Sequence, residues 1–171
     1  MGRLTNSEVA DKWAECKRSA GGNMSSTTYG NGCICYSYST PIARMFEYKG
    51  ETVSVMFDGP DTNTTAHHKS HMRHAVGKRH IPLYILPCVG YSRCHYYIHD
   101  EKKFTDLCVK EIVDSLKGGH KNQAEMYRRR CYAETAIKFR NGALSGELKL
   151  KQLKEVAETG WCSDFDKICR L

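Results

Sequence analysis

Hydrophobic positions near the start of the chain recur with a helical period. Thr5-x-x-Glu8 has the spacing of a capping box, and apolar residues follow it at positions i, i+4 and i+7. This pattern predicts a short amphipathic helix over about 6–19. The next stretch, 24–32, is rich in Ser, Thr, Gly and Asn, and we expect it to form a loop.

The hydrophobic period changes to two after residue 32. The segments 33–39, 42–48 and 52–57 alternate in polarity or are rich in β-branched and aromatic residues, which is typical of strands. A Ser-Thr-Pro break separates the first two, and Lys49-Gly50 forms a turn before the third. The pattern predicts a three-stranded antiparallel meander.

Helical periodicity returns after this sheet. A helix is expected to begin at Asn63, Thr64 or Thr65, whose side chains can cap it, and to run to about Val76. The segment 77–103 holds two short apolar runs, which form either extra strands or ordered loop. Three more helices and a capped turn are expected over 105–116, 121–140, 145–160 and 163–166.

Length and composition bound the architecture. The chain has 171 residues, of which 40% are hydrophobic and 26% are charged, with a mean hydropathy of -0.57. This is enough apolar surface to form a packed core in one compact domain. We therefore predict a single α+β domain over 1–171, with an α+β part over 1–100 and a helical part over 104–171.

Two short segments carry a family resemblance. Tyr36-Ser-Tyr-Ser-Thr-Pro-Ile-Ala43, followed by Asn63-Thr-Thr-Ala-His-His68, resembles a family of small uncharacterised proteins that are common in bacteriophage genomes. The match covers roughly residues 29–76. The resemblance implies a viral origin and an α+β core, but no reaction. The positions that it highlights are Tyr38, Thr40, Pro41, Thr64, Thr65 and His68.

Positive charge is concentrated in the second part of the chain. The net charge is +7, and the excess lies after position 60. A concentrated basic surface favours nucleic acid or an acidic protein surface as the partner; alternatively, it only keeps the protein solvated. The candidate nucleic-acid-binding residues are Lys69, Arg73, Lys78, Arg79, Arg128, Arg129, Arg130, Lys138 and Arg140. Since three consecutive arginines spread over about 200° of a helix, at least two should reach solvent.

The expected helix after residue 62 has two possible roles. Its N-terminus can form an anion-binding corner from Thr64, Thr65 and His68, because free backbone N–H groups attract anions. The alternative is a capped helix with His68 packed against the sheet. His67, His71 and His74 fall on one helical face and are weak metal candidates, with zinc possible, although no carboxylate lies between Thr62 and Ile98.

The cysteine spacing and the hydropathy of the chain reduce the number of candidate functions. The nine cysteines lack the paired spacing of a zinc site, so we expect reduced thiols, and no cofactor is predicted. No segment is long and apolar enough for a membrane span, and we expect a cytoplasmic protein, in the host cell if the chain is viral. The sequence favours a non-enzymatic phage-type accessory protein that binds nucleic acid. The alternatives are a protein–protein module or inhibitor of a host factor, and a metal-dependent enzyme that uses the His-rich helix.

Overall fold

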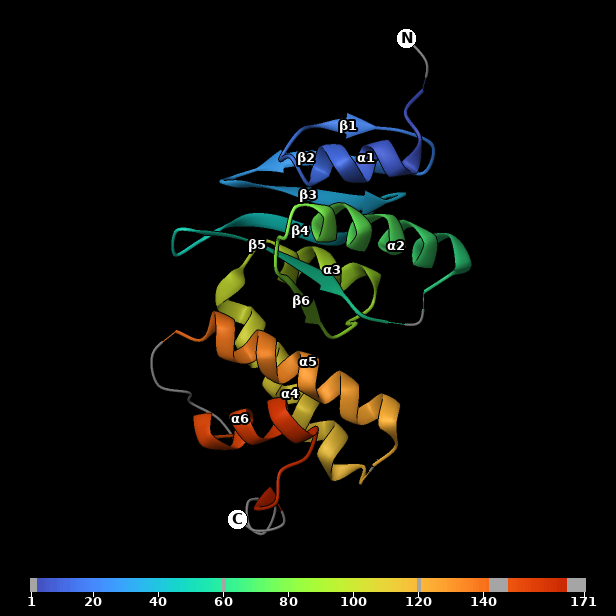
Figure 1. Cartoon of the computed structure of the whole chain (residues 1–171). Helices are drawn as coiled ribbons and strands as arrows, with labels where there is room; N and C mark the ends of the chain where they lie inside the picture. The colour runs from blue at the N-terminus through green and yellow to red at the C-terminus, as the bar shows by residue number, and fades with distance from the viewer. Residues whose placement is uncertain (1–2, 60, 120, 142–147, 166–171) are drawn as a thin grey trace. The chain divides into compact units, whose positions relative to one another are not determined.

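The computed structural model describes residues 3–59, 61–119, 121–141 and 148–165 (Figure 1). The chain divides into two compact units. The first comprises residues 1–84 and 88–98, and the second comprises residues 85–87 and 99–171. Helices and strands both contribute, so the predicted α+β class is confirmed.

One mixed sheet holds all the described strands in sequence order. These strands are β1 (Ser19–Ala20), β2 (Met24–Tyr29), β3 (Gly32–Ser37), β4 (Thr40–Tyr48), β5 (Glu51–Phe57) and β6 (Leu83–Leu86). The first five pair antiparallel with their neighbours. The expectation of three strands was wrong, because the sheet has six.

The additional strands lie where the sequence signal was weak. Strand β2 falls in the segment that was expected to be a loop, yet its Thr, Thr and Tyr residues suit a strand, and Met24 and Ser26 face the interior. Strand β6 comes from the first of the two apolar runs in 77–103. The second run forms α3 (Tyr91–Ile98), a helix that was not expected.

Helices cover both faces of the sheet in the first unit. In Figure 1, α1 (Asn6–Trp13) and α2 (Asn63–Lys78) lie on one side, and α3 lies on the other. The capping box of Thr5 and Glu8 is confirmed. Helix α1 is shorter than the expected 6–19, because the backbone enters the left-handed region at Cys16 (φ 54°).

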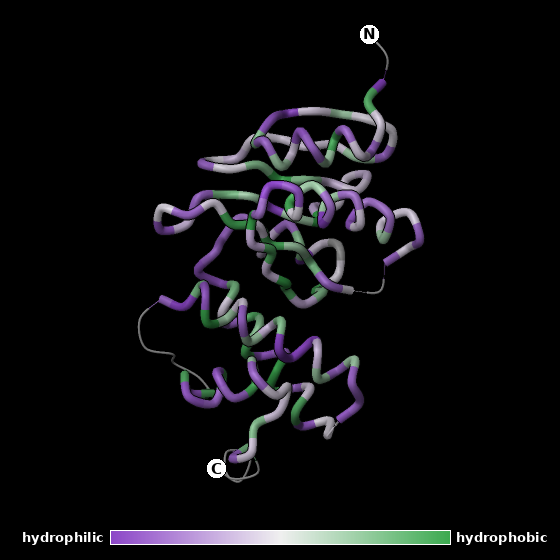
Figure 2. The backbone as a smooth tube through the Cα atoms, in the orientation of Figure 1, coloured by the Kyte–Doolittle hydropathy of each residue, from purple (hydrophilic) through white to green (hydrophobic). Residues whose placement is uncertain are grey.

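The core of the first unit lies between the sheet and these helices. Trp13 is fully buried, and its indole N–H donates to the carbonyl of Cys33 at 2.9 Å. On the other face, Arg44 is 4% exposed and donates to the carbonyl of Ile98. Hydrophobic residues run along β3 to β5, whereas long stretches of α2 are hydrophilic (Figure 2).

The second unit is helical, as predicted. It contains the short 3-10 helix η1 (Glu101–Lys103) and the helices α4 (Phe104–Lys117), α5 (Gln123–Phe139) and α6 (Leu150–Thr159). Phe104 and Phe139 pack edge to face with ring centroids 5.2 Å apart. The expected helix start at Ser145 and the last residue of the expected final turn, Asp166, lie outside the described residues.

The eight described cysteines are free thiols, and five of them are buried. Desolvation raises the pKa of Cys33 and of Cys94 to about 11, so these thiols stay protonated at neutral pH. Their role is that of small hydrophobic side chains in the core.

Candidate functional site: the basic helices and the His68 cluster

The end of β3 and the start of α2 meet in a group of polar side chains around three buried residues, Ser37, Thr65 and His68. We call this group, together with the half-buried Asn6 and the exposed Thr62, the His68 cluster. His68 is 1% exposed. Its Nδ1 lies 2.8 Å from Oγ of Ser37, and its Nε2 lies 3.1 Å from Nδ2 of Asn6. The Ser37 hydroxyl also contacts Oγ1 of Thr65 at 3.2 Å. Three elements, α1, β3 and α2, are thereby joined.

Both ring nitrogens of His68 have polar partners. With the Asn6 amide in the orientation that the structure gives it, the amide nitrogen donates to Nε2, and a neutral imidazole then donates from Nδ1 to the Ser37 hydroxyl. Desolvation lowers the pKa of His68, and the neighbouring His71 and His67 lower it further.

The expected anion-binding corner is wrong in its details. The N-cap of α2 is Thr62, one position before the expected caps, and its side chain accepts from the N–H of Thr65. Thr65 is 8% exposed and His68 1%, and both bond within the cluster, so neither reaches an external anion. Thr64 is half-buried. This arrangement corresponds to the alternative, a capped helix with His68 packed against the sheet.

The three metal candidates lie on the outer side of α2. His67 and His74 are exposed, and His71 is half-buried. Within the described part of the chain, no group of three or more His, Cys, Asp or Glu side chains is placed to hold a metal ion. These histidines together with Arg73 form an exposed polar face on α2 that bears no carboxylate.

Lys69 is not part of any basic surface, which corrects its prediction as a nucleic-acid ligand. Its side chain is 3% exposed, and its Nζ lies 2.7 and 2.8 Å from the two carboxylate oxygens of Asp61. The helical period places residue 69 on the inner side of α2, beside His68 and Met72. A lysine at such a position must be paired, because an isolated buried ammonium group is costly.

The cations at the end of α2 are paired with α1. Arg79 donates to Asp11 at 3.2 Å and to Glu15 at 2.9 Å, and Lys78 lies 3.9 Å from Asp11. Hydrogen bonds from Lys17 and then Arg79 lower the pKa of Glu15. Arg79 therefore joins two helices of the first unit.

The three consecutive arginines of α5 differ in their exposure to solvent. Arg128 and Arg130 are exposed, which confirms that at least two of the three arginines reach solvent. Arg129 is fully buried and donates to the hydroxyl and carbonyl oxygens of Ser115 and to the carbonyl of Gly160. Its prediction as a surface ligand is therefore corrected: it connects α5 to Ser115 in the last turn of α4 and to Gly160 at the C-cap of α6.

An aromatic side chain stands between the two exposed arginines. Tyr127 is 66% exposed. At 100° per residue, Arg130 lies about 60° from Tyr127 on one side of the helix, and Arg128 lies about 100° away on the other. We define the α5 outer face as Tyr127, Arg128, Arg130, Glu134 and Lys138. Arg140, the last of the candidate residues, is exposed at the C-cap of α5.

A second aromatic residue of this unit lies between cations. The Nζ of Lys121 is 4.4 Å from the centroid of the Trp161 ring, and the guanidinium carbon of Arg129 is 5.3 Å from the same ring. These are cation–π distances. The sequence analysis did not single out Trp161, because no pattern in the neighbouring residues shows that its side chain lies against Arg129 of α5.

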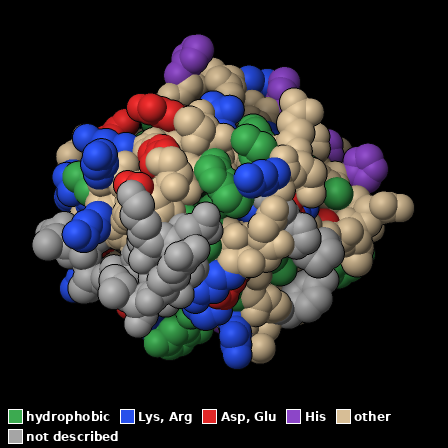
Figure 3. All heavy atoms as spheres, turned by 90° about the horizontal axis from the view of Figure 1, so that it is seen from below, with side chains coloured by type: hydrophobic (Ala, Val, Ile, Leu, Met, Phe, Trp, Pro, Cys, Tyr) green, Lys and Arg blue, Asp and Glu red, His purple; other side chains and the backbone are tan. Residues whose placement is uncertain are grey.

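The molecular surface shows how the charges are distributed on one side. Lys and Arg side chains in the view from below are interspersed with acidic and neutral side chains (Figure 3). Among the cations of α5, Arg128 is 51% exposed and pairs with Glu125 at 2.9 Å. An exposed pair of this kind contributes little to stability.

Comparison of the chain with protein-family models, with curated proteins and with solved structures finds no match. Among the residues described, no helix combines the length and the apolar character that crossing a bilayer requires.

Proposed function

We propose that this is a non-enzymatic, phage-type accessory protein that binds nucleic acid through the α5 outer face. The observation that carries the proposal is Tyr127, which is 66% exposed between two exposed arginines. Guanidinium groups bind phosphate through two parallel hydrogen bonds, and a tyrosine ring stacks on a base. The phage origin rests on the resemblance of residues 29–76.

This surface is smaller than the one predicted from the sequence. It loses Lys69 and Arg129, which are buried, and Arg79, which is paired with two carboxylates. It retains Arg128, Arg130 and Lys138 around an aromatic centre. Because exposed aromatic rings favour unpaired bases, single-stranded DNA or RNA is the preferred partner.

Fluorescence anisotropy with labelled single-stranded and duplex oligonucleotides tests the proposal. About three phosphate contacts on a single strand give a log–log salt slope near -2. The double substitution Arg128→Glu and Arg130→Glu should weaken binding by about tenfold or more and flatten this slope.

A matched control comes from α6 of the same unit. Lys151→Glu with Lys154→Glu changes the net charge equally at two other exposed positions. These substitutions should leave the affinity within about twofold of the wild type. Equal losses in the two variants, or binding that does not depend on salt, would contradict the proposal. Binding to an acidic protein but not to nucleic acid would favour the protein–protein alternative.

A further inference from the structure

Four ionisable side chains form a row along the outer side of α2. They are His67, His71, His74 and Lys78, separated by four, three and four residues. At about 100° and 1.5 Å per residue, they lie within about 60° of one another around the helix and extend over about 17 Å. His67, His74 and Lys78 are exposed, and His71 is half-buried. We call this row the α2 ridge.

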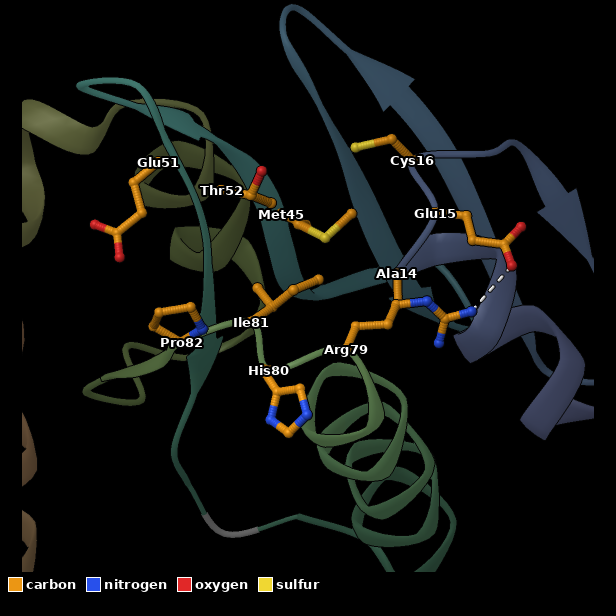
Figure 4. A pocket seen from close by; sticks show the side chains of 10 residues that line it. All are labelled: Ala14, Glu15, Cys16, Met45, Glu51, Thr52, Arg79, His80, Ile81 and Pro82. Atoms are coloured by element: carbon orange, nitrogen blue, oxygen red, sulfur yellow. Dashed lines mark hydrogen bonds and ion pairs between the residues drawn. The ribbon is translucent and has the colours of Figure 1, made fainter.

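Beyond the ridge, α2 ends at a pocket of about 540 Å³, which is also lined by residues from the end of α1 and from β4 and β5 (Figure 4). Arg79, in one wall of this pocket, donates to Glu15 at 2.9 Å and to Asp11 at 3.2 Å. Lys78 lies farther from Asp11, at 3.9 Å, and its side chain is 50% exposed. The closer partner of Asp11 is therefore Arg79, and the ridge lysine extends into solvent.

Among the described residues, no acidic side chain forms an ion pair with the three histidines of the ridge. Helix α2 contains no Asp or Glu. On α1, which packs beside it, Glu8 is bonded to the N-cap Thr5, and the remaining charged group besides Asp11 is the cation Lys12. Asp61, which precedes α2, binds Lys69. The outer side of α2 is therefore a surface without compensating negative charge.

The charge of this ridge depends on pH. Histidine gains a proton between about pH 8 and pH 5, whereas lysine is protonated throughout this range, so the ridge carries about one positive charge at pH 8 and about four at pH 5. Arg73, which is exposed on the outer side of the same helix, adds a constant charge. His68 does not contribute, because it is 1% exposed and desolvation lowers its pKa.

The surroundings of the ridge fit a phosphate chain better than a membrane or a protein. Ala66, Ser70 and Gly77 are small, exposed residues on the outer side of α2, so they leave room for a partner beside the ridge. Helix α2, which is described in full, exposes no large apolar side chain, as a membrane contact would require. Cations repeat every 4.5–6 Å or so along the ridge, and a nucleic-acid strand offers one anion per nucleotide, whereas a polypeptide needs a run of Asp and Glu to do so.

We propose that the α2 ridge binds the phosphate backbone of nucleic acid and that this contact strengthens as the pH falls below neutral. The proposal rests on the nucleic-acid binding proposed above and adds a second contact, in the first unit, with its own pH dependence. Each imidazolium donates a charge-assisted hydrogen bond to a phosphate oxygen. Since a bound phosphate favours the protonated ring, binding takes up protons from the solvent, and a lower pH promotes binding through the same coupling.

Fluorescence anisotropy of the full chain with a labelled oligothymidylate, whose bases do not titrate just below neutral pH, tests the ridge. Between pH 7.5 and 6.0, the wild-type affinity should increase about tenfold, and two added phosphate contacts should steepen the log–log salt slope by about 1.4. The double substitution His67→Gln and His74→Gln should remove most of this increase and leave the affinity at pH 7.5 within about twofold of the wild type. The single substitution His74→Gln should lose part of the increase, whereas the matched control His95→Gln, at an exposed histidine of α3, should keep it.

The double substitution Arg128→Glu and Arg130→Glu distinguishes a failure of the ridge from a failure of the α5 outer face. This variant should bind more weakly than the wild type at both pH values and still gain affinity at pH 6.0. If it binds as tightly as the wild type while the gain depends on the ridge histidines, the ridge is supported and the α5 outer face is overturned. A wild-type affinity that does not increase at pH 6.0, an equal loss of the gain in His74→Gln and His95→Gln, or tighter binding to poly-L-glutamate than to the oligothymidylate overturns the ridge.

Discussion

Nδ1 of His68 lies 2.8 Å from Oγ of Ser37, a residue 31 positions earlier in the chain. This hydrogen bond ties the first turns of α2 to the end of β3. Tyr38 follows with a positive φ of 54°, and its ring centroid is 6.3 Å from that of His68. The two segments of the phage-family resemblance therefore meet at one place in the fold.

Replacement of His68 should destabilise the first unit strongly. His68→Ala leaves the buried Ser37 hydroxyl and the Asn6 amide without their partner and opens a cavity, which should lower the free energy of unfolding by about 3 kcal/mol. Urea denaturation measures this loss. His67→Ala, an exposed neighbour on the same helix, should change stability by less than about 0.5 kcal/mol. Similar values for the two variants would show that the cluster contributes little.

The stability of the wild type should decrease as the pH is lowered, before any carboxylate becomes protonated. The pKa of His68 in the folded state is below the ordinary value of 6.5, so the unfolded chain takes up this proton more readily. The stabilisation is complete above about pH 6.5 and is lost as the pH decreases toward the folded-state pKa. Urea midpoints at pH 7.5 and 5.5 should differ more for the wild type than for His68→Ala, whereas His67→Ala should keep the wild-type difference.

The two partners of the buried ion pair should respond unequally to substitution. Asp61→Asn leaves the ammonium group of Lys69 buried without a counter-charge, and should cost about 3 kcal/mol. Lys69→Met removes the buried charge and leaves only Asp61, whose side chain is 23% exposed and can hydrate, so it should cost less. Asp114→Asn breaks an exposed pair with Lys110 and should cost under about 0.5 kcal/mol. Chemical denaturation ranks the three, and a larger loss for Lys69→Met would contradict this account.

The β4–β5 turn offers a test of backbone conformation alone. Lys49 and Gly50 both have positive φ, 51° and 80°, as a type I′ turn requires. Asparagine suits the first position better than lysine, so Lys49→Asn should raise stability by about 0.5 kcal/mol, after the loss of a cation–π contact with Tyr48. Gly50→Ala should lower it by about 1 kcal/mol, although a Cβ there meets nothing within 4 Å. Thermal unfolding of both variants should give opposite shifts.

Periodicity predicted the long elements of this protein well. Helices α4 and α5 and strands β4 and β5 lie within a few residues of their predicted ranges, because their apolar spacing is regular over many residues. Strand β2 was not predicted because its Ser and Thr residues are also typical of turns and loops. Helix α3 was not predicted, because a segment of eight residues that includes three tyrosines is also typical of a strand.

The candidate site was less predictable than the fold. Sequence reasoning identified His68 and the arginine run, but it could not tell which cations the fold would bury. Lys69 and Arg129 differ from their exposed neighbours only by their angle around a helix. Asn6 and Ser37 were missed because their partner lies far away in the sequence. The pocket depends on two helix ends that come together only in three dimensions.

The chain has two tryptophans, and each compact unit contains one. Trp13 is sealed from water with its N–H bonded to Cys33, whereas Trp161 is half-buried between Lys121 and Arg129. Their emission spectra should therefore differ, with Trp13 the bluer of the two. With either indole replaced by phenylalanine, the remaining one is a built-in optical reporter of its own unit. Coincident or separate melting of the two signals then reveals whether the units unfold as one cooperative body.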